Sequence, residues 1–369
     1  MNADSSHVNA AGSHGPLPSL HLPRRTRMLL WAALLVLVGA VAADVLAGPG
    51  VTLTPMLAVT PMVSAPATRD PRVPLATGAA ATVVAVLIAY FVDVALPISV
   101  HVASLLSIIA ASLASAAAVA LMASRERELF DVRNVAEAAQ RALLRPPPER
   151  IGHLRIAVRY TAAAAESRIG GDLYEVTETP YGVRILLGDV QGHGLAAVET
   201  AADVLGAFRA GSRIMANLVQ LAERMDRIQA SHAMQERFVT ALLLEVPPTG
   251  PAKFVNCGHP PPLLRRAGRV VELEPPAAAP PLGLRHLVGG RYQAGLFEPR
   301  RGDLLLLYTD GVSEARDRAD RFYPLAERLA ALRASAPEDL LDLLLADVGR
   351  WAEHGLTDDA ALLALRWDR

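Results

Sequence analysis

The first third of the chain contains apolar runs that are long enough to cross a lipid bilayer. They are MLLWAALLVLVGAVAADVLAG from Met28, VPLATGAAATVVAVLIAYFV from Val73 and LPISVHVASLLSIIAASLASAAAVALMAS from Leu96. A membrane-spanning helix needs about 20 apolar residues. With 52% hydrophobic residues and a mean hydropathy of +0.28, the chain is more apolar than an ordinary soluble protein. We therefore expect retained membrane helices rather than a cleaved signal peptide or buried soluble helices.

A shorter apolar segment, VTLTPMLAVTPMVSAPA from Val51, contains three prolines, which membrane helices tolerate better than soluble helices do. If this segment also crosses, the arginine-bearing segments Arg24–Arg27, Arg69–Arg72 and Arg125–Glu128 all lie on one side of the membrane. With three crossings, Arg125–Glu128 would lie outside. Because short cytoplasmic loops carry the excess of arginine, the sequence predicts four membrane helices with both ends in the cytoplasm.

Changes in composition divide the chain into four parts. Residues 1–23 are rich in Ser, His, Asn, Gly and Pro and are expected to be disordered. Residues 24–123 form the membrane domain, 124–150 a cytoplasmic linker and 151–369 one soluble domain. Apolar residues in the linker recur at helical spacing up to Leu143, and the prolines that follow end the helix. This stalk helix either pairs with a second copy to form a homodimer or is a solvated connector with one packed face.

The soluble domain alternates between strand-like and helical patterns. The strand-like runs are LRIAVRY, GVRILLGDV, RFVTALLLEV, AKFVNCGH, DLLLLYTD and AALLALRW, and helical patterns cover 195–228 and 325–352. Several strands follow one another without a helix between them, so a doubly wound parallel sheet fits poorly. We predict the α+β class, with a β-sandwich covered by helices.

Acidic residues lie at the ends of several of these runs. Asp172 follows RIGG, Asp189 ends RILLGD, Asp310 ends LLLLYTD, and Asp358 and Asp359 open the last strand. A single Asp beside Gly is usually a turn residue. Acids at the ends of core strands are costly unless they are paired or bind a cation. Several carboxylates without a thiolate indicate a site for Mg²⁺ or Mn²⁺, and two such ions can orient and ionise a water for phosphoryl displacement.

Other site classes fit the sequence less well. The stretch LLGDVQGHGLAA from Leu186 lacks the Lys and Ser or Thr of a phosphate-binding P-loop and the spacing of a dinucleotide fingerprint. The net charge of −1 gives no overall basic surface for nucleic acid. Cys257 is the single cysteine, which excludes an intrachain disulfide and a zinc site built on cysteines.

Seven stretches, taken together and in this order, resemble the PPM (PP2C-type) protein phosphatases, and among them the bacterial SpoIIE-like branch. They are IGGDLYEV, LLGDVQGHGLAA, FVTALLLEV, VNCGHPPPLL, PPLGL, LLLLYTDGVSEARD and TDDAALL, all between Ile151 and Trp367. The preceding segments resemble the membrane-anchored members of that branch. The resemblance implies a PP2C-like β-sandwich flanked by helices, with a two-metal centre at one end.

The resemblance also implies a ligand set. Asp172 and Asp189 match the core metal ligands, with Asp189 bridging, and the backbone carbonyl of Val190 completes the set. Asp310 and Asp358 match the ligands of the other ion. The attacking group is then a water bound to the two Mn²⁺ or Mg²⁺ ions, and no protein nucleophile is needed.

Five further residues of the matching stretches have other interpretations. Asp359 matches the position beside a ligand and is expected to support the site without binding a metal. Glu175 stands where the family often has a second Asp, so it keeps an outer-sphere role. His193 stands where a Lys or another residue is common, and it either shuttles protons or is a turn residue. His259 is interpreted as a turn residue, and Cys257 as a small apolar residue in a strand.

The function implied is that of a metal-dependent serine/threonine protein phosphatase of the cell membrane, with its catalytic domain in the cytoplasm. Its substrate would be a phosphoprotein, typically an anti-sigma-factor antagonist, whose dephosphorylation frees a sigma factor. A signal would pass from the membrane through the stalk to the helices after Leu195. One alternative is a membrane-anchored scaffold that binds a phosphoprotein with little turnover. Another is a membrane receptor that binds a nucleotide, which the missing P-loop Lys disfavours.

Overall fold

The computed structural model describes residues 24–48, 52–161, 170–231, 237–352, 356 and 358–368. The chain forms two compact units, Met1–Leu129 and Phe130–Arg369. The segment predicted to be disordered, 1–23, lies outside the described residues. The predicted linker begins within a continuous helix, since α4 runs from Ile98 to Leu143 and belongs in part to each unit.

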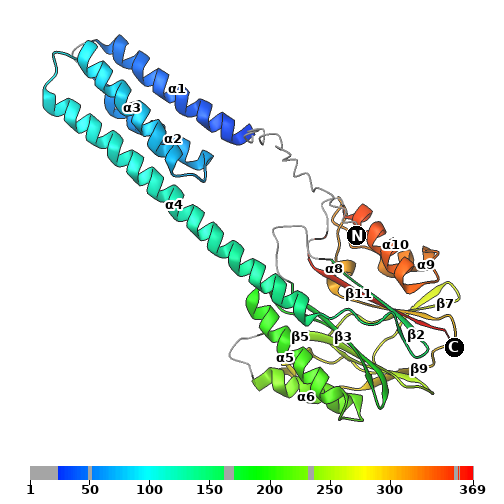
Figure 1. The fold of residues 1–369 in the computed structure, drawn as a ribbon. Helices are drawn as coiled ribbons and strands as arrows, with labels where there is room; N and C mark the ends of the chain where they lie inside the picture. The colour runs from blue at the N-terminus through cyan, green and yellow to red at the C-terminus, as the bar shows by residue number, and fades with distance from the viewer. Residues whose placement is uncertain are drawn as a thin grey trace, which may run out of the picture. The chain divides into compact units, whose positions relative to one another are not determined.

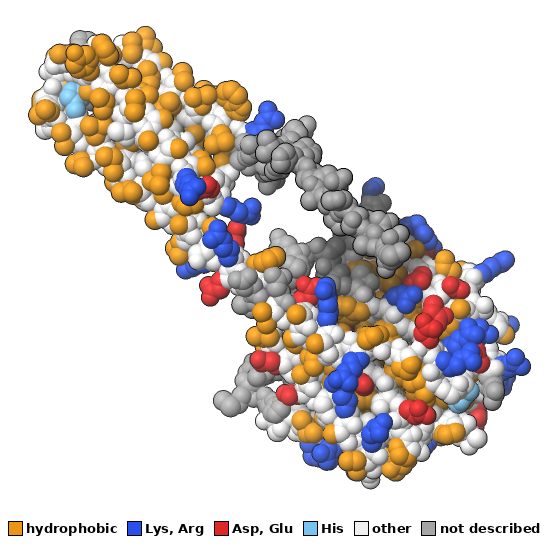
Figure 2. All heavy atoms as spheres, viewed as in Figure 1, with side chains coloured by type: hydrophobic (Ala, Val, Ile, Leu, Met, Phe, Trp, Pro, Cys, Tyr) orange, Lys and Arg blue, Asp and Glu red, His pale blue; other side chains and the backbone are white. Residues whose placement is uncertain are grey.

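Three helices of the first unit are long and apolar enough to cross a membrane. They are α1 (Arg24–Ala47), α3 (Arg72–Phe91) and α4, of which Ile98–Glu128 is the apolar part. Large apolar side chains are exposed on these helices, and they cover the face of this unit seen in Figure 2. Helices that are apolar all round are typical of membrane spans.

The short segment from Val51, predicted as an additional crossing between α1 and α3, is not one long helix. It consists of η1 (Thr54–Ala58), α2 (Val59–Ser64) and η2 (Ala65–Ala67). Proline lies in the first turn of both 3₁₀ pieces, and because proline has no backbone N–H, a helix that precedes it cannot continue regularly through it. Three long apolar helices are therefore observed among the described residues, and the number of crossings stays a prediction.

Two contacts show how this broken segment runs relative to α4. At its start, Thr54 Oγ1 donates to Ser104 Oγ at 3.2 Å, six residues into α4. Beyond its end, Arg69 Nε donates to Glu126 Oε2 at 2.7 Å, at the far end of the apolar part of α4. The segment and its following loop therefore span most of the length of the apolar part of α4.

The second unit contains two antiparallel sheets (Figure 1). One has the strand order β1-β2-β11-β10-β7-β8 and the other β3-β4-β5-β6-β9. The strands are β1 Arg150–Ile151, β2 Leu154–Thr161, β3 Asp172–Thr179, β4 Gly182–Val190, β5 Val239–Val246, β6 Ala252–Cys257, β7 Leu263–Arg266, β8 Arg269–Glu272, β9 Ala294–Phe297, β10 Leu304–Tyr308 and β11 Ala360–Trp367. The helices are α5 Leu195–Ser212, α6 Leu218–Ser231, α7 Arg285–Val288, α8 Asp310–Ser313, α9 Leu325–Ala331 and α10 Pro337–Trp351.

The sheets stack face to face, and helices cover the outer face of each. Alternation along β4 shows the arrangement, because Ile185 and Leu187 lie in the cluster between the sheets whereas Leu186 lies in the cluster beneath α5 and α6. On the other side, Leu306 of β10 packs with Leu341 of α10. The predicted α+β sandwich is confirmed.

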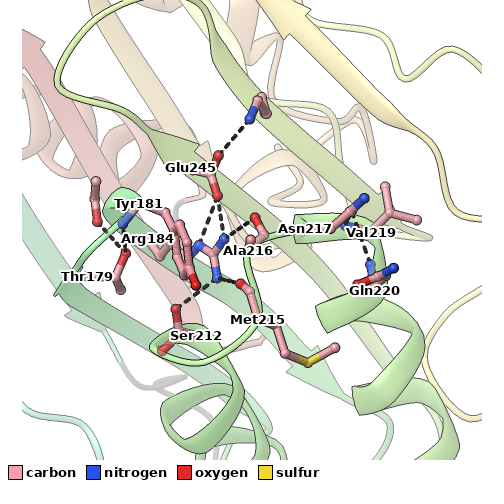
Figure 3. A network of polar contacts seen from close by, with 12 residues as sticks. Thr179, Tyr181, Arg184, Ser212, Met215, Ala216, Asn217, Val219, Gln220 and Glu245 are labelled. Atoms are coloured by element: carbon pink, nitrogen blue, oxygen red, sulfur yellow. Dashed lines mark hydrogen bonds and ion pairs between the residues drawn. The ribbon is translucent and has the colours of Figure 1, made fainter.

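A buried arginine fastens α5 to its sheet (Figure 3). Arg184 on β4 is fully buried and donates through Nε to Glu245 Oε2 of the neighbouring strand β5 at 3.0 Å. It also donates to the carbonyls of Ser212 at 2.8 Å, Met215 at 2.6 Å and Ala216 at 2.9 Å. A cation at the carboxyl end of a helix satisfies carbonyls that lack helical partners, so Arg184 fixes the turn between α5 and α6.

Candidate metal centre

The first two predicted ligands face each other at one end of a sheet. Asp172 begins β3 and is paired in register with Asp189 near the end of β4. Gly171 makes this approach close, because a Cβ at that position would lie 2.2 Å from the Val190 carbonyl oxygen and 2.6 Å from Asp189 Oδ1. The structure therefore brings the two carboxylates and the Val190 carbonyl to one place.

A threonine links this pair to the other sheet. Thr309, between β10 and α8, donates its hydroxyl to Asp172 Oδ2 at 2.9 Å. The Thr309 hydroxyl oxygen in turn accepts the backbone N–H of Ala361 on β11 at 2.8 Å. Thr309 is completely buried, so it fixes one oxygen of Asp172 in place, next to the helix α8 that Asp310 opens.

The last acidic motif packs between two glycines. Asp359 is 4% exposed, and a Cβ on Gly170 would lie 1.4 Å from its Oδ2 atom. A Cβ on Gly311 would lie 1.9 Å from its backbone oxygen. Asp358 is exposed and its Oδ1 accepts the Asp359 backbone N–H at 2.9 Å. Side-chain-free glycines thus bring three acidic motifs together.

The acidic side chains of this region have raised pKa values, because they are buried and lie close to one another. Burial, and then Asp310, Asp358 and Asp359, raise the pKa of Asp189 to about 7. Burial, and then Asp189, raise the pKa of Asp172 well above its ordinary value. The pKa of Asp310 is raised for the same two kinds of reason, burial first and nearby acids second. Removal from water and repulsion between like charges both disfavour the ionised form.

These donors fit a hard divalent cation in chemistry, since carboxylate and carbonyl oxygens are the ligands that Mg²⁺ and Mn²⁺ prefer. A divalent cation would also reverse the repulsion that raises the pKa values. Within the described part of the chain, however, no group of three or more His, Cys, Asp or Glu side chains is arranged to hold a metal ion. Asp172 and Asp189 pair across β3 and β4, and Asp310 and Asp358 lie near Gly311, so the full ligand set stays a prediction.

Glu175 has a partner that the sequence did not reveal. Its carboxylate lies 2.6 Å from the guanidinium of Arg209 on α5, and Arg209 also donates to the Leu143 carbonyl at the end of α4 at 2.9 Å. Glu175 therefore ties the edge of β3 to α5 and, through Arg209, to the linker. Its predicted outer-sphere role at a metal is not tested by this contact.

The two histidines differ in their surroundings. His193 is exposed, and it lies in a turn between Gly192 and Gly194, which have φ of +94° and +85°. Glycine adopts this backbone conformation readily. His259 is buried, its Nδ1 lies 3.0 Å from Thr240 Oγ1, and burial lowers its pKa to about 4. It is held neutral in the turn after β6, in line with the interpretation of His259 as a turn residue.

Comparison with known proteins adds to this geometry. Residues 179–368 match the family model described as Stage II sporulation protein E (SpoIIE). The SiaA-PP2C domain of Pseudomonas aeruginosa is similar in structure, with a TM-score of 0.55 and 21% identity over 67% of this chain and 100% of that one. The PP2C phosphatase domain of SpoIIE from Bacillus subtilis, solved with a fragment of its regulatory domain, gives a TM-score of 0.50 and 18% identity, covering 58% of this chain and 64% of that one.

A third similar structure contains the RsbU and RsbW domains of Rv1364c from Mycobacterium tuberculosis. It has 27% identity and a TM-score of 0.49 and covers 58% of this chain. This chain spans 60% of that structure's length. At these levels of identity, the two PP2C structures above show a shared fold.

Proposed function

Because the chain belongs to the SpoIIE family, we propose that it is a metal-dependent phosphatase that hydrolyses phosphoserine or phosphothreonine on a protein. The observation that carries the proposal is the in-register pair Asp172 and Asp189, with the Val190 carbonyl beside it. The proposal is supported by the approach of the Asp359 segment to Gly170 and Gly311, which places the acidic motifs of both sheets at the same end of the sandwich.

Asp172, Asp189, the Val190 carbonyl, Asp310 and Asp358 would hold two Mn²⁺ or Mg²⁺ ions. When bound, such ions supply Lewis acidity to a water molecule and to the phosphate oxygens. The chain's own residues set the geometry. The Thr309 hydroxyl donates to Asp172 Oδ2, so Asp172 would offer a cation a carboxylate whose position is already fixed.

The proposed substrate follows from the family resemblance, and the proposed location follows from the apolar helices of the first unit. We propose that the substrate is a phosphorylated anti-sigma-factor antagonist and that the three apolar helices anchor the protein in the cell membrane, with the catalytic unit in the cytoplasm. A homodimer through the stalk helix is part of the proposal. Exposed Phe130 and Val135 on α4 support it, because they offer apolar surface to a second helix.

Contacts within the second unit support a regulatory role for the linker. Ala136, Ala139 and Leu143 of α4 pack on Val198 of α5, the helix that follows the Asp189 motif. A change in the linker would therefore act on α5 and on the turn that precedes it. If the full chain in membranes and a variant without 124–143 showed equal activity, this part of the proposal would be wrong.

The test of the phosphatase activity uses the full chain in detergent, with a phosphoprotein or an aryl phosphate as substrate. We expect turnover with Mn²⁺, none in EDTA, and a loss of at least about 100-fold for Asp310→Ala. The matched control is Asp320→Asn, which alters an acid that is 79% exposed in a surface ion pair. Turnover that persists in EDTA or in Asp310→Ala would overturn the metal mechanism.

A second candidate is a scaffold that binds a phosphoprotein without turnover. The observation that favours it is that the acids of the described residues do not converge into a ready metal-binding group. Tight binding of a phosphoprotein by a folded protein that shows no turnover with Mn²⁺ would support the scaffold and refute the enzyme.

A further inference from the structure

A buried glutamine of the linker contacts the acidic end of the sandwich. Gln140 on α4 is 7% exposed, and its Nε2 atom donates to the Gly170 carbonyl at 3.1 Å and to the Tyr160 hydroxyl at 3.0 Å. A backbone carbonyl can only accept, so this bond fixes the orientation of the amide. Both N–H groups of the amide are then used.

The Tyr160 hydroxyl continues the chain of hydrogen bonds. It is also hydrogen-bonded to the Asp359 carboxylate, and burial, followed by Asp359 and Asp172, raises its pKa, so it stays protonated. Since the oxygen accepts from Gln140, its proton is available for Asp359. The bonds therefore run in one direction, from Gln140 through Tyr160 to Asp359, and bonds so arranged polarise one another favourably.

Both ends of this network lie beside predicted ligands. Gly170 precedes Asp172 by two residues, and Asp359 directly follows Asp358. The two ends also touch, because a Cβ on Gly170 would fall 1.4 Å from Asp359 Oδ2. Gln140 thus contacts the segment before β3 directly and the Asp359 segment through Tyr160, so the linker is bonded to both at the acidic end of the sandwich.

We infer that Gln140 and Tyr160 are positioning residues for the metal centre, an inference that rests on the proposed function. Gln140 fixes the position of the Gly170 carbonyl, and Tyr160 fixes the position of the Asp359 carboxylate. Together they fix the separation between the Asp172 and Asp358 segments. Loss of the linker contact would let these segments move apart and weaken cation binding without changing any ligand.

The test measures Mn²⁺ binding to the full chain in detergent by titration calorimetry. Loss of an outer partner of a metal ligand typically weakens affinity by about 10- to 100-fold, and we expect a change in this range for Tyr160→Phe and for Gln140→Leu. Because the two residues act in one network, the double variant is expected to lose little more than either single variant. Tyr181→Phe and Gln220→Leu are matched controls, since each lies outside the network, and they should bind Mn²⁺ like the unaltered protein.

Hydrogen exchange in EDTA gives a second readout that needs no metal. Thr309 bonds the Ala361 amide and Asp358 bonds the Asp359 amide, and we expect both amides to exchange faster in Tyr160→Phe than in Tyr181→Phe. Unchanged Mn²⁺ affinity together with unchanged exchange in Tyr160→Phe would overturn the inference. If the unaltered protein bound no Mn²⁺, the proposed function would fail, and the exchange rates would still decide whether Tyr160 positions this segment.

Discussion

Asp172 and Asp189 are directly opposite each other on adjacent antiparallel strands. Like charges in this arrangement destabilise a sheet, and burial adds to the cost. The pKa of Asp189 is raised to about 7 by burial first and by Asp310, Asp358 and Asp359 after it. The acidic end of the sandwich is therefore held together against its own repulsion by the rest of the fold.

The first prediction concerns pH and stability without a divalent cation. An Asp with a folded-state pKa near 7 and an unfolded pKa of about 3.9 binds more protons when folded between these values. Stability therefore falls as the pH rises through this window. We expect the metal-free protein, in detergent with EDTA, to melt at a higher temperature at pH 5 than at pH 8, as measured by tryptophan fluorescence.

The control for this prediction is Asp189→Asn, which removes the group with the raised pKa. Its melting temperature should depend less on pH than that of the unaltered protein over the same range. Addition of Mn²⁺ should raise the melting temperature most at pH 8, where the carboxylates are ionised. A melting temperature that rises from pH 5 to pH 8 in EDTA would contradict the prediction.

The second prediction concerns the close approach of Gly171 to the Val190 carbonyl. In Gly171→Ala the new Cβ would meet the Val190 carbonyl oxygen at 2.2 Å, and because that atom is backbone it cannot rotate away. We expect a loss of about 1–3 kcal/mol in the free energy of unfolding and the loss of phosphatase activity. Gly206→Ala is the control, since that glycine is exposed within α5 with nothing within 4 Å of the Cβ site.

Gly206→Ala should raise stability by up to about 1 kcal/mol, because alanine favours a helix over glycine, and should leave activity unchanged. Thermal melts and turnover of the two variants, measured side by side, separate the effect of crowding the Val190 carbonyl from a general effect of adding a methyl group. Full activity in Gly171→Ala would show that the approach of β3 to the Val190 carbonyl is not needed.

The third prediction concerns the number of membrane crossings. Arg69 is bonded to Glu126, and the broken helix before it runs along α4, so we expect four crossings with Arg27 and Arg69 on the same side. If the broken segment did not cross, the two would lie on opposite sides. In a Cys257→Ala background, Arg27→Cys and Arg69→Cys should react with an impermeant maleimide only after cell lysis. Ala95→Cys, in the turn between α3 and α4, should react in intact cells.

Much of the fold follows from local pattern. Strands such as β4, β5 and β11 are continuous apolar runs between two packed layers, so they are visible in the sequence. Strand β3 reads DLYEVTET and β8 reads RVVE, and their polar content conceals them. These strands form because neighbouring strands supply their hydrogen bonds, which is a tertiary effect.

The sequence predicts which residues belong to the candidate site, but it does not predict the strand pairing and hydrogen bonds that join them. Acids at the ends of apolar runs indicate a cation site, but the pairing of Asp172 with Asp189 depends on strand register. The contact of Thr309 with Asp172 joins residues 137 positions apart in the chain. The contact of Gln140 with Gly170 requires the docked linker. Periodicity carries no information about such long-range contacts, although the Thr beside Asp310 in YTDG is a local signal that could have been used for Thr309.

The last prediction concerns the buried ion pair beneath α5. Arg184 is fully buried, and its partner Glu245 is 2% exposed. In Arg184→Met the negative charge of Glu245 would keep Lys253 as its remaining cation. Breaking a buried pair typically costs about 3–5 kcal/mol, and we expect a correspondingly lower free energy of unfolding. Arg316→Met, which breaks an exposed pair with Asp320, should cost less than about 1 kcal/mol.

The double change Arg184→Met with Glu245→Met should restore stability only in part. It removes the unpaired charge, but the carbonyls after α5 still lose their donor. Full recovery in the double variant would show that Arg184 serves Glu245 alone and does not hold the α5–α6 turn.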